Sequence, residues 1–153
     1  MPYAVLCWGW GMMARGRRAM ILDISPLERA ISMLEEGYAR YLADVTDEQI
    51  RDGLIQRFEF TYELSHRMLK RYLESISPSP GEYDDRDFQY LIRSGNEQGL
   101  LLGNWPRWRL YREMRSKTSH TYDEKVALEV VSGIPDFLEE ARYLRDKLAE
   151  HLV

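Results

Sequence analysis

The sequence is poor in the residues that build disulfides, tight turns and membrane spans. It has a single cysteine, Cys7, which excludes an internal disulfide and a zinc site made from several cysteines. Ten glycines and six prolines in 153 residues are few, and this scarcity favours helices over a turn-rich β fold. No apolar run approaches the ~18 residues that a membrane span needs. We therefore expect no membrane segment and a cytoplasmic protein.

Positive charge is not in excess either. The chain has 21 Lys and Arg residues against 25 Asp and Glu residues, which gives a formal net charge of −4. This balance excludes a protein that is basic overall and binds nucleic acid through that charge, but it permits a local basic patch. The charged fraction of 30% and the hydrophobic fraction of 44% are typical of a folded globular domain rather than a disordered chain. No cluster of side chains has metal-ligand spacing, so we expect neither a metal ion nor a cofactor.

The first 24 residues do not share the pattern of the rest. They hold two tryptophans and three glycines without a helical or strand period, and three arginines follow the apolar stretch. Positive charge comes first in an ordinary signal peptide, so the order here is reversed. We expect residues 1–24 to be an N-terminal extension, either flexible or an over-long reading frame that truly starts at Met13 or Met20. Residues 25–153 are expected to form one helical domain.

From residue 25 onward, apolar residues recur at helical spacing. Ser25, Pro26 and Glu28 are typical of a helix start in which Ser25 is the N-cap and Glu28 closes a capping box. The expected helices begin at residue 25, near 46 (ending about 75), near 84 (ending about 94), near 104, and at 123 (ending about 151). Gly133 and Pro135 should kink or interrupt the last helix. We predict an all-α fold, an antiparallel bundle of about five helices.

The second expected helix has an unusually broad apolar surface. Its main stripe is widened by further apolar residues, so the helix should be covered on two sides. One side could pack inside the bundle and the other against a second copy of the chain. The stripe consists of Ile50, Leu54, Phe58, Tyr62, Leu69, Leu73 and Ile76, and it is widened by Phe60, Leu64 and Met68.

One group of residues, at the joint between the last two helices, is suited to chemistry. Arg115 lies near the end of a helix, and His120 and Tyr122 lie in the connection that follows. An arginine can hold a phosphate and stabilise the charge of a transition state, and a histidine can move a proton near neutral pH. This set favours RNA cleavage without a metal, with Arg115 and His120 converging only if the helix ends between them. The alternative is that His120 and Tyr122 only cap and pin the two helices.

The helix that carries Arg115 is locally basic. From residue 105 to 117 there are five Arg or Lys residues against one Glu, a net charge of +4, with aromatic residues between them. Such a stretch can contact phosphates through its cations and bases through its rings, or it can be a solvated face backed by core aromatics. Trp108 and Tyr111 fit the core stripe. The residues that we expect to contact RNA or a nucleotide are Arg109, Arg112, Ser116, Lys117 and Ser119.

Residues 27–148 resemble the helical partner proteins of minimal nucleotidyltransferases. These are the nucleotidyltransferase substrate-binding proteins, which belong with HepT-like toxins in the HEPN superfamily. The resemblance is carried by residues 52–64, 69–70, 72–73 and 115–123, and by Trp108 seven residues before Arg115. The superfamily signature is Arg, four to six residues, His, any residue and Tyr. Arg115, His120 and Tyr122 match it with a spacing of four, although Ser116 stands where asparagine is usual.

This resemblance implies a fold, partners and an activity. It implies a homodimer of HEPN-type bundles with the arginine and histidine of both subunits facing one cleft. It also implies a metal-independent endoribonuclease toxin of a type VII-like toxin–antitoxin pair. The partner would be a minimal nucleotidyltransferase (MntA-like) antitoxin, which silences the toxin by adding AMP to Tyr122.

Two other interpretations belong to different classes of protein. The chain could be a non-catalytic subunit that binds a substrate for the nucleotidyltransferase, or a scaffold dimer whose signature residues only hold helices together. His66 stands where the family commonly has tryptophan, and we interpret it as structural. Arg57 and Glu59 are also interpreted as structural, and His151 as a surface residue.

Overall fold

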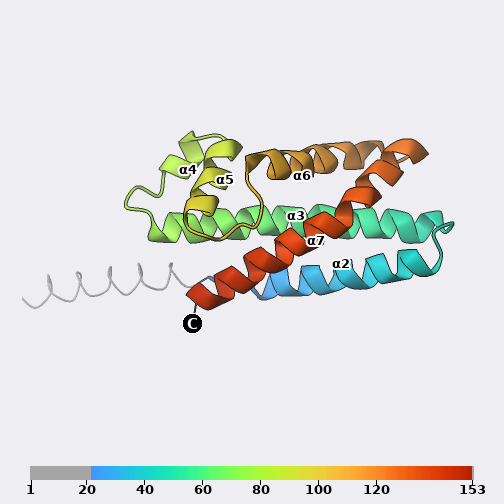
Figure 1. Cartoon of the computed structure of the whole chain (residues 1–153), viewed down its shortest axis with the longest axis horizontal. Helices are drawn as coiled ribbons and strands as arrows, with labels where there is room; N and C mark the ends of the chain where they lie inside the picture. Colours follow the sequence, from blue (N-terminus) through green and yellow to red (C-terminus); the bar gives the residue numbers. More distant parts are fainter. Residues whose placement is uncertain (1–21, 153) are drawn as a thin grey trace, which may run out of the picture.

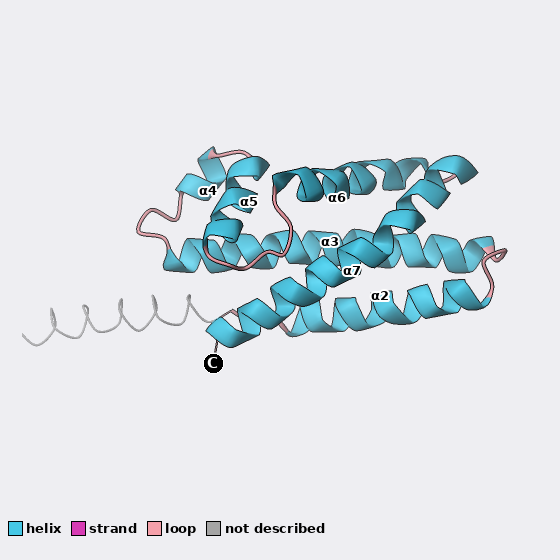
Figure 2. Cartoon of the chain, in the orientation of Figure 1, coloured by secondary structure: helices cyan, strands magenta, loops and turns pink. Residues whose placement is uncertain are grey.

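The computed structural model describes residues 22–152. The expectations for residues 1–21, including the interpretation of Cys7, lie outside the described residues. Figure 2 shows helices joined by loops throughout the described part, which confirms the predicted all-α class. The helices are α2 (Ser25–Ala43), α3 (Glu48–Ile76), α4 (Glu82–Asp85), α5 (Phe88–Glu97), α6 (Trp105–Lys117) and α7 (Glu124–His151), with a 3-10 turn, η1 (Thr118–His120), between α6 and α7.

Helix α3 is the central element of the bundle. Helices α2 and α3 lie side by side and antiparallel, α7 crosses both of them diagonally, and α6 runs along α3 (Figure 1). Helix α5 packs at the far end of α3, beside the start of α6. Most of the apolar stripe of α3 is therefore buried within one chain, whereas Phe60 and Leu64 are half-buried and Ile76 is exposed. One of the two predicted sides of this helix thus packs inside the bundle, and the packing of the other side against a second copy of the chain stays a prediction.

The core is built around aromatic side chains from three helices. Phe58 of α3 and Phe137 of α7 are fully buried, with ring centroids 5.0 Å apart in an edge-to-face arrangement. Trp108 and Tyr111 of α6 join them, and the Tyr111 ring lies 5.3 Å from that of Phe137. Edge-to-face aromatic pairs stabilise a core by more than the burial of their apolar surface alone would. The cluster fixes α6, and hence the signature segment that follows it, against α3 and α7.

Aspartates begin three of the helices. Asp47, Asp87 and Asp123 each accept a hydrogen bond from a backbone N–H in the first turn of α3, α5 and α7. The predicted starts of the second and last helices are thereby confirmed. The capping box predicted at Ser25 is wrong. Ile24 is the N-cap of α2, and the Ser25 hydroxyl instead donates to the Asp23 carboxylate at 2.6 Å.

The middle of the chain differs from the prediction in two places. Residues 82–85 form the short helix α4, which was not predicted, and α5 begins about four residues and ends about three residues later than expected. Gly95 lies inside α5 rather than beyond its end, because it is buried against Leu101. The residue that reverses the chain is Gly99, with φ of +70°, a conformation that favours glycine.

Helix α7 runs through Pro135 without interruption, and its path bends along its length in Figure 1. The helix is therefore bent rather than interrupted, which is one of the two outcomes that the sequence predicted. Gly133 has a packing role, because a Cβ at this position would lie only 2.5 Å from the sulfur of Met114 on α6. Helices α6 and α7 can approach closely here for lack of a side chain. No helix within residues 22–152 combines the length and the apolar character of a membrane span.

Candidate functional site

Helix α6 presents a buried aromatic face and an exposed basic face. Trp108 and Tyr111 are buried, as expected, and Arg109 and Arg112 are exposed. Arg109 pairs with Glu113 on the same helix, with 3.3 Å between nitrogen and oxygen. Lys117 pairs with Glu129 of α7 at the same distance. Exposed ion pairs of this kind contribute only ~0–1 kcal/mol to the stability of the fold. Arg109 and Lys117 can therefore leave their carboxylates and bind a phosphate instead.

Arg115 points from α6 toward α3. Its Nε lies 3.0 Å from a carboxylate oxygen of Glu63, and its Nη1 lies 3.9 Å from one of Glu59. Nη1 also donates a hydrogen bond of 3.1 Å to the hydroxyl of Thr118. The side chain is 35% exposed, so solvent reaches this pair and an anion can compete with Glu63 for the guanidinium. The sequence did not predict this pairing, since residues 59 and 63 are far from residue 115 along the chain.

Helix α6 ends at Lys117, and the chain turns through η1 before α7 begins. The expected end of the helix between Arg115 and His120 is thereby confirmed. His120 is exposed and Tyr122 is 88% exposed, with their ring centroids 6.2 Å apart. The buried residue of this segment is Thr118, whose hydroxyl donates to the carbonyl of Arg115 at 2.7 Å. Thr118 therefore pins the turn, and His120 and Tyr122 face the solvent.

A hollow of about 310 Å³ opens beside Arg115, between α3, α5 and α6. Two of the predicted RNA-contacting residues, Arg112 and Ser116, line it together with Arg115. The other lining residues, which the sequence analysis did not assign to a site, are Tyr62, Glu63, His66 and Phe88. Ser119 lies outside this lining; it is exposed on η1, and its hydroxyl is 3.4 Å from the carbonyl of Ser116.

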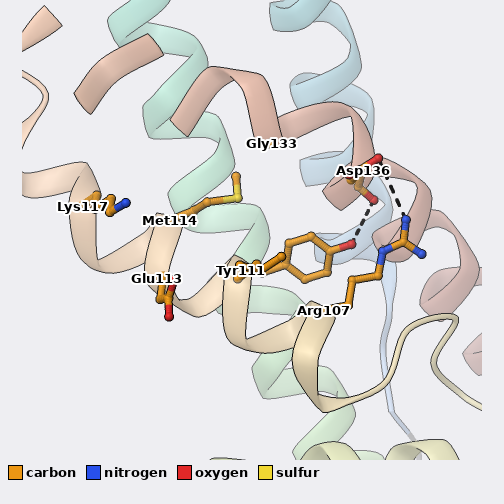
Figure 3. Close-up of a pocket in the computed structure, with 8 residues that line it drawn as sticks. Arg107, Tyr111, Glu113, Met114, Lys117, Gly133 and Asp136 are labelled. Carbon is orange, nitrogen blue, oxygen red and sulfur yellow. Dashed lines mark hydrogen bonds and ion pairs between the residues drawn. The ribbon is translucent and has the colours of Figure 1, made fainter. Parts of the chain in front are cut away.

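A second hollow, of about 240 Å³, lies between α6 and α7 beside Gly133 and Asp136 (Figure 3). The Tyr111 hydroxyl donates to the backbone carbonyl of Asp136 at 3.3 Å, and Arg107 lies 3.9 Å from the Asp136 carboxylate. Burial raises the pKa of Tyr111, so its hydroxyl stays protonated as a donor. These contacts join the two helices. Within residues 22–152, no three histidine, cysteine or carboxylate side chains are grouped to hold a metal ion.

A buried carboxylate fixes the loop that leads into α6. Glu140 of α7 is fully buried and accepts hydrogen bonds from the backbone N–H groups of Leu102 and Gly103, each at 2.7 Å. Gly103 makes this approach possible, because a Cβ there would lie 2.7 Å from the carboxylate. Burial raises the pKa of Glu140 above its usual 4.5, and the two N–H donors act against that rise. The start of α6 is thus tied to the middle of α7.

Replacing Glu140 with leucine is expected to lower the free energy of unfolding by about 1–3 kcal/mol at neutral pH, because the backbone N–H groups of Leu102 and Gly103 would lose their acceptor. Since the folded-state pKa of Glu140 is raised, protonation favours the folded state. The advantage of the wild type over the leucine variant should therefore grow as the pH falls through that pKa, and be complete below about 4.5. Urea unfolding across this range measures it. Glu139→Leu, at an exposed neighbour, is the control; a difference that does not change with pH would contradict the raised pKa.

The bundle, its basic helix and the signature that joins α6 to α7 define a class of helical nucleotidyltransferase-associated proteins. The chain belongs to the family described as nucleotidyltransferase substrate binding protein like, whose model matches residues 22–150. It is 34% identical over 137 residues to a Haemophilus influenzae protein named "Probable ribonuclease HepT", covering 84% of this chain and 93% of that protein. The family predicted from the sequence is therefore confirmed.

A solved structure from the same organism has a similar fold. It is described as the fold of a substrate binding domain of a nucleotidyltransferase. The two chains superpose with a TM-score of 0.77 at 32% sequence identity, over 83% of this chain and 99% of that one. The bundle described above is thus found in a relative associated with nucleotidyl transfer.

Proposed function

We propose that this protein is the toxin of a toxin–antitoxin pair, a metal-independent endoribonuclease that acts as a homodimer. The observation that carries the proposal is the similarity to the probable ribonuclease, together with the match of Arg115, His120 and Tyr122 to the superfamily signature. The exposure of His120 supports it, because a residue that moves protons on RNA must be reachable from solvent. The locally basic face of α6 suits a polyanionic substrate.

The roles of the residues follow from their chemistry. The 2′-hydroxyl of the RNA attacks the adjacent phosphorus, the bond to the 5′-oxygen breaks, and a 2′,3′-cyclic phosphate and a free 5′-hydroxyl remain. The phosphate replaces Glu63 as the partner of the Arg115 guanidinium. Arg115 then stabilises the negative charge that develops on the phosphate. His120 moves the proton of the attacking or leaving oxygen. No step in this scheme requires a metal ion.

The partner in this proposal is a minimal nucleotidyltransferase antitoxin that adds AMP to Tyr122. Tyr122 is well placed for such a modification, because it is 88% exposed and lies next to His120. A phosphodiester-linked nucleotide on its hydroxyl would add negative charge and bulk beside the catalytic histidine. The modified protein would then repel RNA.

The chemistry of the RNA ends tests the proposal. Incubation of the purified protein with an RNA pool in EDTA is expected to give fragments with 2′,3′-cyclic phosphates and 5′-hydroxyls. Cleavage that stops on chelation, or fragments with 5′-phosphates, would contradict a metal-independent attack by the 2′-hydroxyl.

A second candidate is a non-catalytic subunit that presents a substrate to the nucleotidyltransferase. The similarity to a substrate binding domain of a nucleotidyltransferase favours it. This candidate predicts a tight complex with the nucleotidyltransferase and nucleotide binding near Arg115, without any loss of RNA.

A further inference from the structure

The hollow beside Arg115 combines aromatic and cationic groups. Phe88 of α5 and His66 of α3 lie on one side, with their ring centroids 4.8 Å apart in an edge-to-face arrangement. The guanidinium of Arg112 lies over the Phe88 ring, 5.4 Å from its centroid. Nucleobases bind proteins by stacking on aromatic rings and on arginine planes. The lining therefore offers the surfaces that an unpaired base requires.

The charge of the hollow suits a base that is attached to a phosphate. Arg112 and Arg115 line it against the single carboxylate of Glu63, so two positive charges face one negative charge. The ion pair between Arg115 and Glu63 is partly exposed, so a phosphate at the rim of the hollow can displace Glu63 and bind the guanidinium. The base of the same nucleotide would then lie over the rings. A volume of about 310 Å³ is at the small end for ligand sites and suits one base rather than a longer segment.

His66 is an unusual residue for a half-buried position in a hydrophobic bundle. Burial lowers the pKa of its imidazole, so the ring is neutral at physiological pH. A neutral imidazole has one N–H donor and one nitrogen acceptor, and both kinds of group match the edge of a base. A neutral ring also lies next to the two arginines without electrostatic repulsion.

We infer that this hollow binds the base of a nucleotide next to the phosphate held by Arg115, with His66 and Phe88 contacting the base and Arg112 covering it. This inference rests on the proposed function, which gives Arg115 its role in holding the phosphate. It adds three residues, His66, Phe88 and Arg112, that would position the RNA by binding one base. His66, which we interpreted as structural from the sequence, becomes a binding residue.

The test uses unmodified protein and a short RNA in which the nucleotides next to the main cleavage site are replaced, one at a time, by an abasic residue. The wild type is expected to cleave the RNA that lacks the bound base about tenfold more slowly. His66→Leu and Phe88→Leu keep apolar bulk in the hollow, and they should cleave the intact and abasic RNAs at nearly the same rate. His151→Leu, at the far end of α7 and against Tyr72, is the matched control and should discriminate like the wild type.

The outcomes separate this inference from the ribonuclease proposal. Wild-type cleavage that ignores every abasic replacement would overturn the base site and leave the ribonuclease standing. If the protein cleaves nothing, the chain's three histidines allow a binding test by NMR. A shift of the His66 signal with AMP, CMP, GMP or UMP, but not with ribose 5-phosphate, would support the base site without ribonuclease activity. No shift of His66 with any nucleotide would overturn it.

Discussion

Replacing His120 with alanine is expected to lower the rate of RNA cleavage by at least about 100-fold, since general acid–base catalysis commonly contributes that much. The fold should be unaffected, because the His120 side chain is exposed and Thr118 makes the buried contacts of the turn. The free energy of unfolding should change by no more than about 0.5 kcal/mol, as is usual for a surface substitution. Cleavage assays in EDTA and urea unfolding of the same preparations give both quantities.

A matched substitution separates chemistry from any general effect of losing a histidine. His151→Ala removes an exposed histidine from the end of α7 and should leave cleavage unchanged. Unchanged cleavage by His120→Ala would remove His120 from the chemistry. A loss of several kcal/mol of stability in that variant would instead favour the scaffold interpretation, in which the signature only holds helices together.

Addition of AMP to Tyr122 is expected to abolish cleavage, with residual activity at least about 100-fold lower than that of the unmodified protein. The reason is the placement of a negative phosphodiester next to His120, whose ring lies 6.2 Å from that of Tyr122. Incubation with a minimal nucleotidyltransferase and ATP, followed by intact mass and a cleavage assay, measures the modification and its effect together.

Tyr122→Phe is the control for this modification. It keeps the ring and removes only the hydroxyl that would carry AMP, so we expect cleavage within about threefold of the wild type and no silencing. Tyr143, a half-buried tyrosine that lies on α7 away from the signature, offers a hydroxyl that should remain unmodified. Silencing of Tyr122→Phe by the same treatment would show that the modified residue lies elsewhere.

Local rules were sufficient to predict most of the helices. Asp47 and Asp123 begin their helices because a carboxylate beside free N–H groups is a local device that the sequence displays directly. Ser25 is not the N-cap, because its hydroxyl donates a hydrogen bond to the carboxylate of Asp23, two residues earlier. Gly95 failed as a stop signal because its contact with Leu101 depends on how the loop folds back. Local competition and tertiary packing account for both errors.

The site was predicted less completely than the fold. Arg115, His120 and Tyr122 could be proposed from the sequence because they are close together in it and form a recognisable spacing. The carboxylates that hold Arg115 come from α3, more than fifty residues earlier, and only the packing of α6 on α3 brings Glu63 to it. The hollow likewise draws on three helices. The periodicity of apolar residues cannot predict contacts between side chains of helices that are far apart in the sequence.

The most direct test of the account is a time course of RNA cleavage in EDTA by the purified wild-type protein, with the intact mass of the same sample recorded. We predict that an unmodified chain fragments the RNA without a metal ion, and that an inactive preparation carries the mass of an added AMP. An unmodified chain that forms the expected complex with its nucleotidyltransferase but leaves the RNA intact would contradict the ribonuclease proposal, and would make the protein a binding subunit.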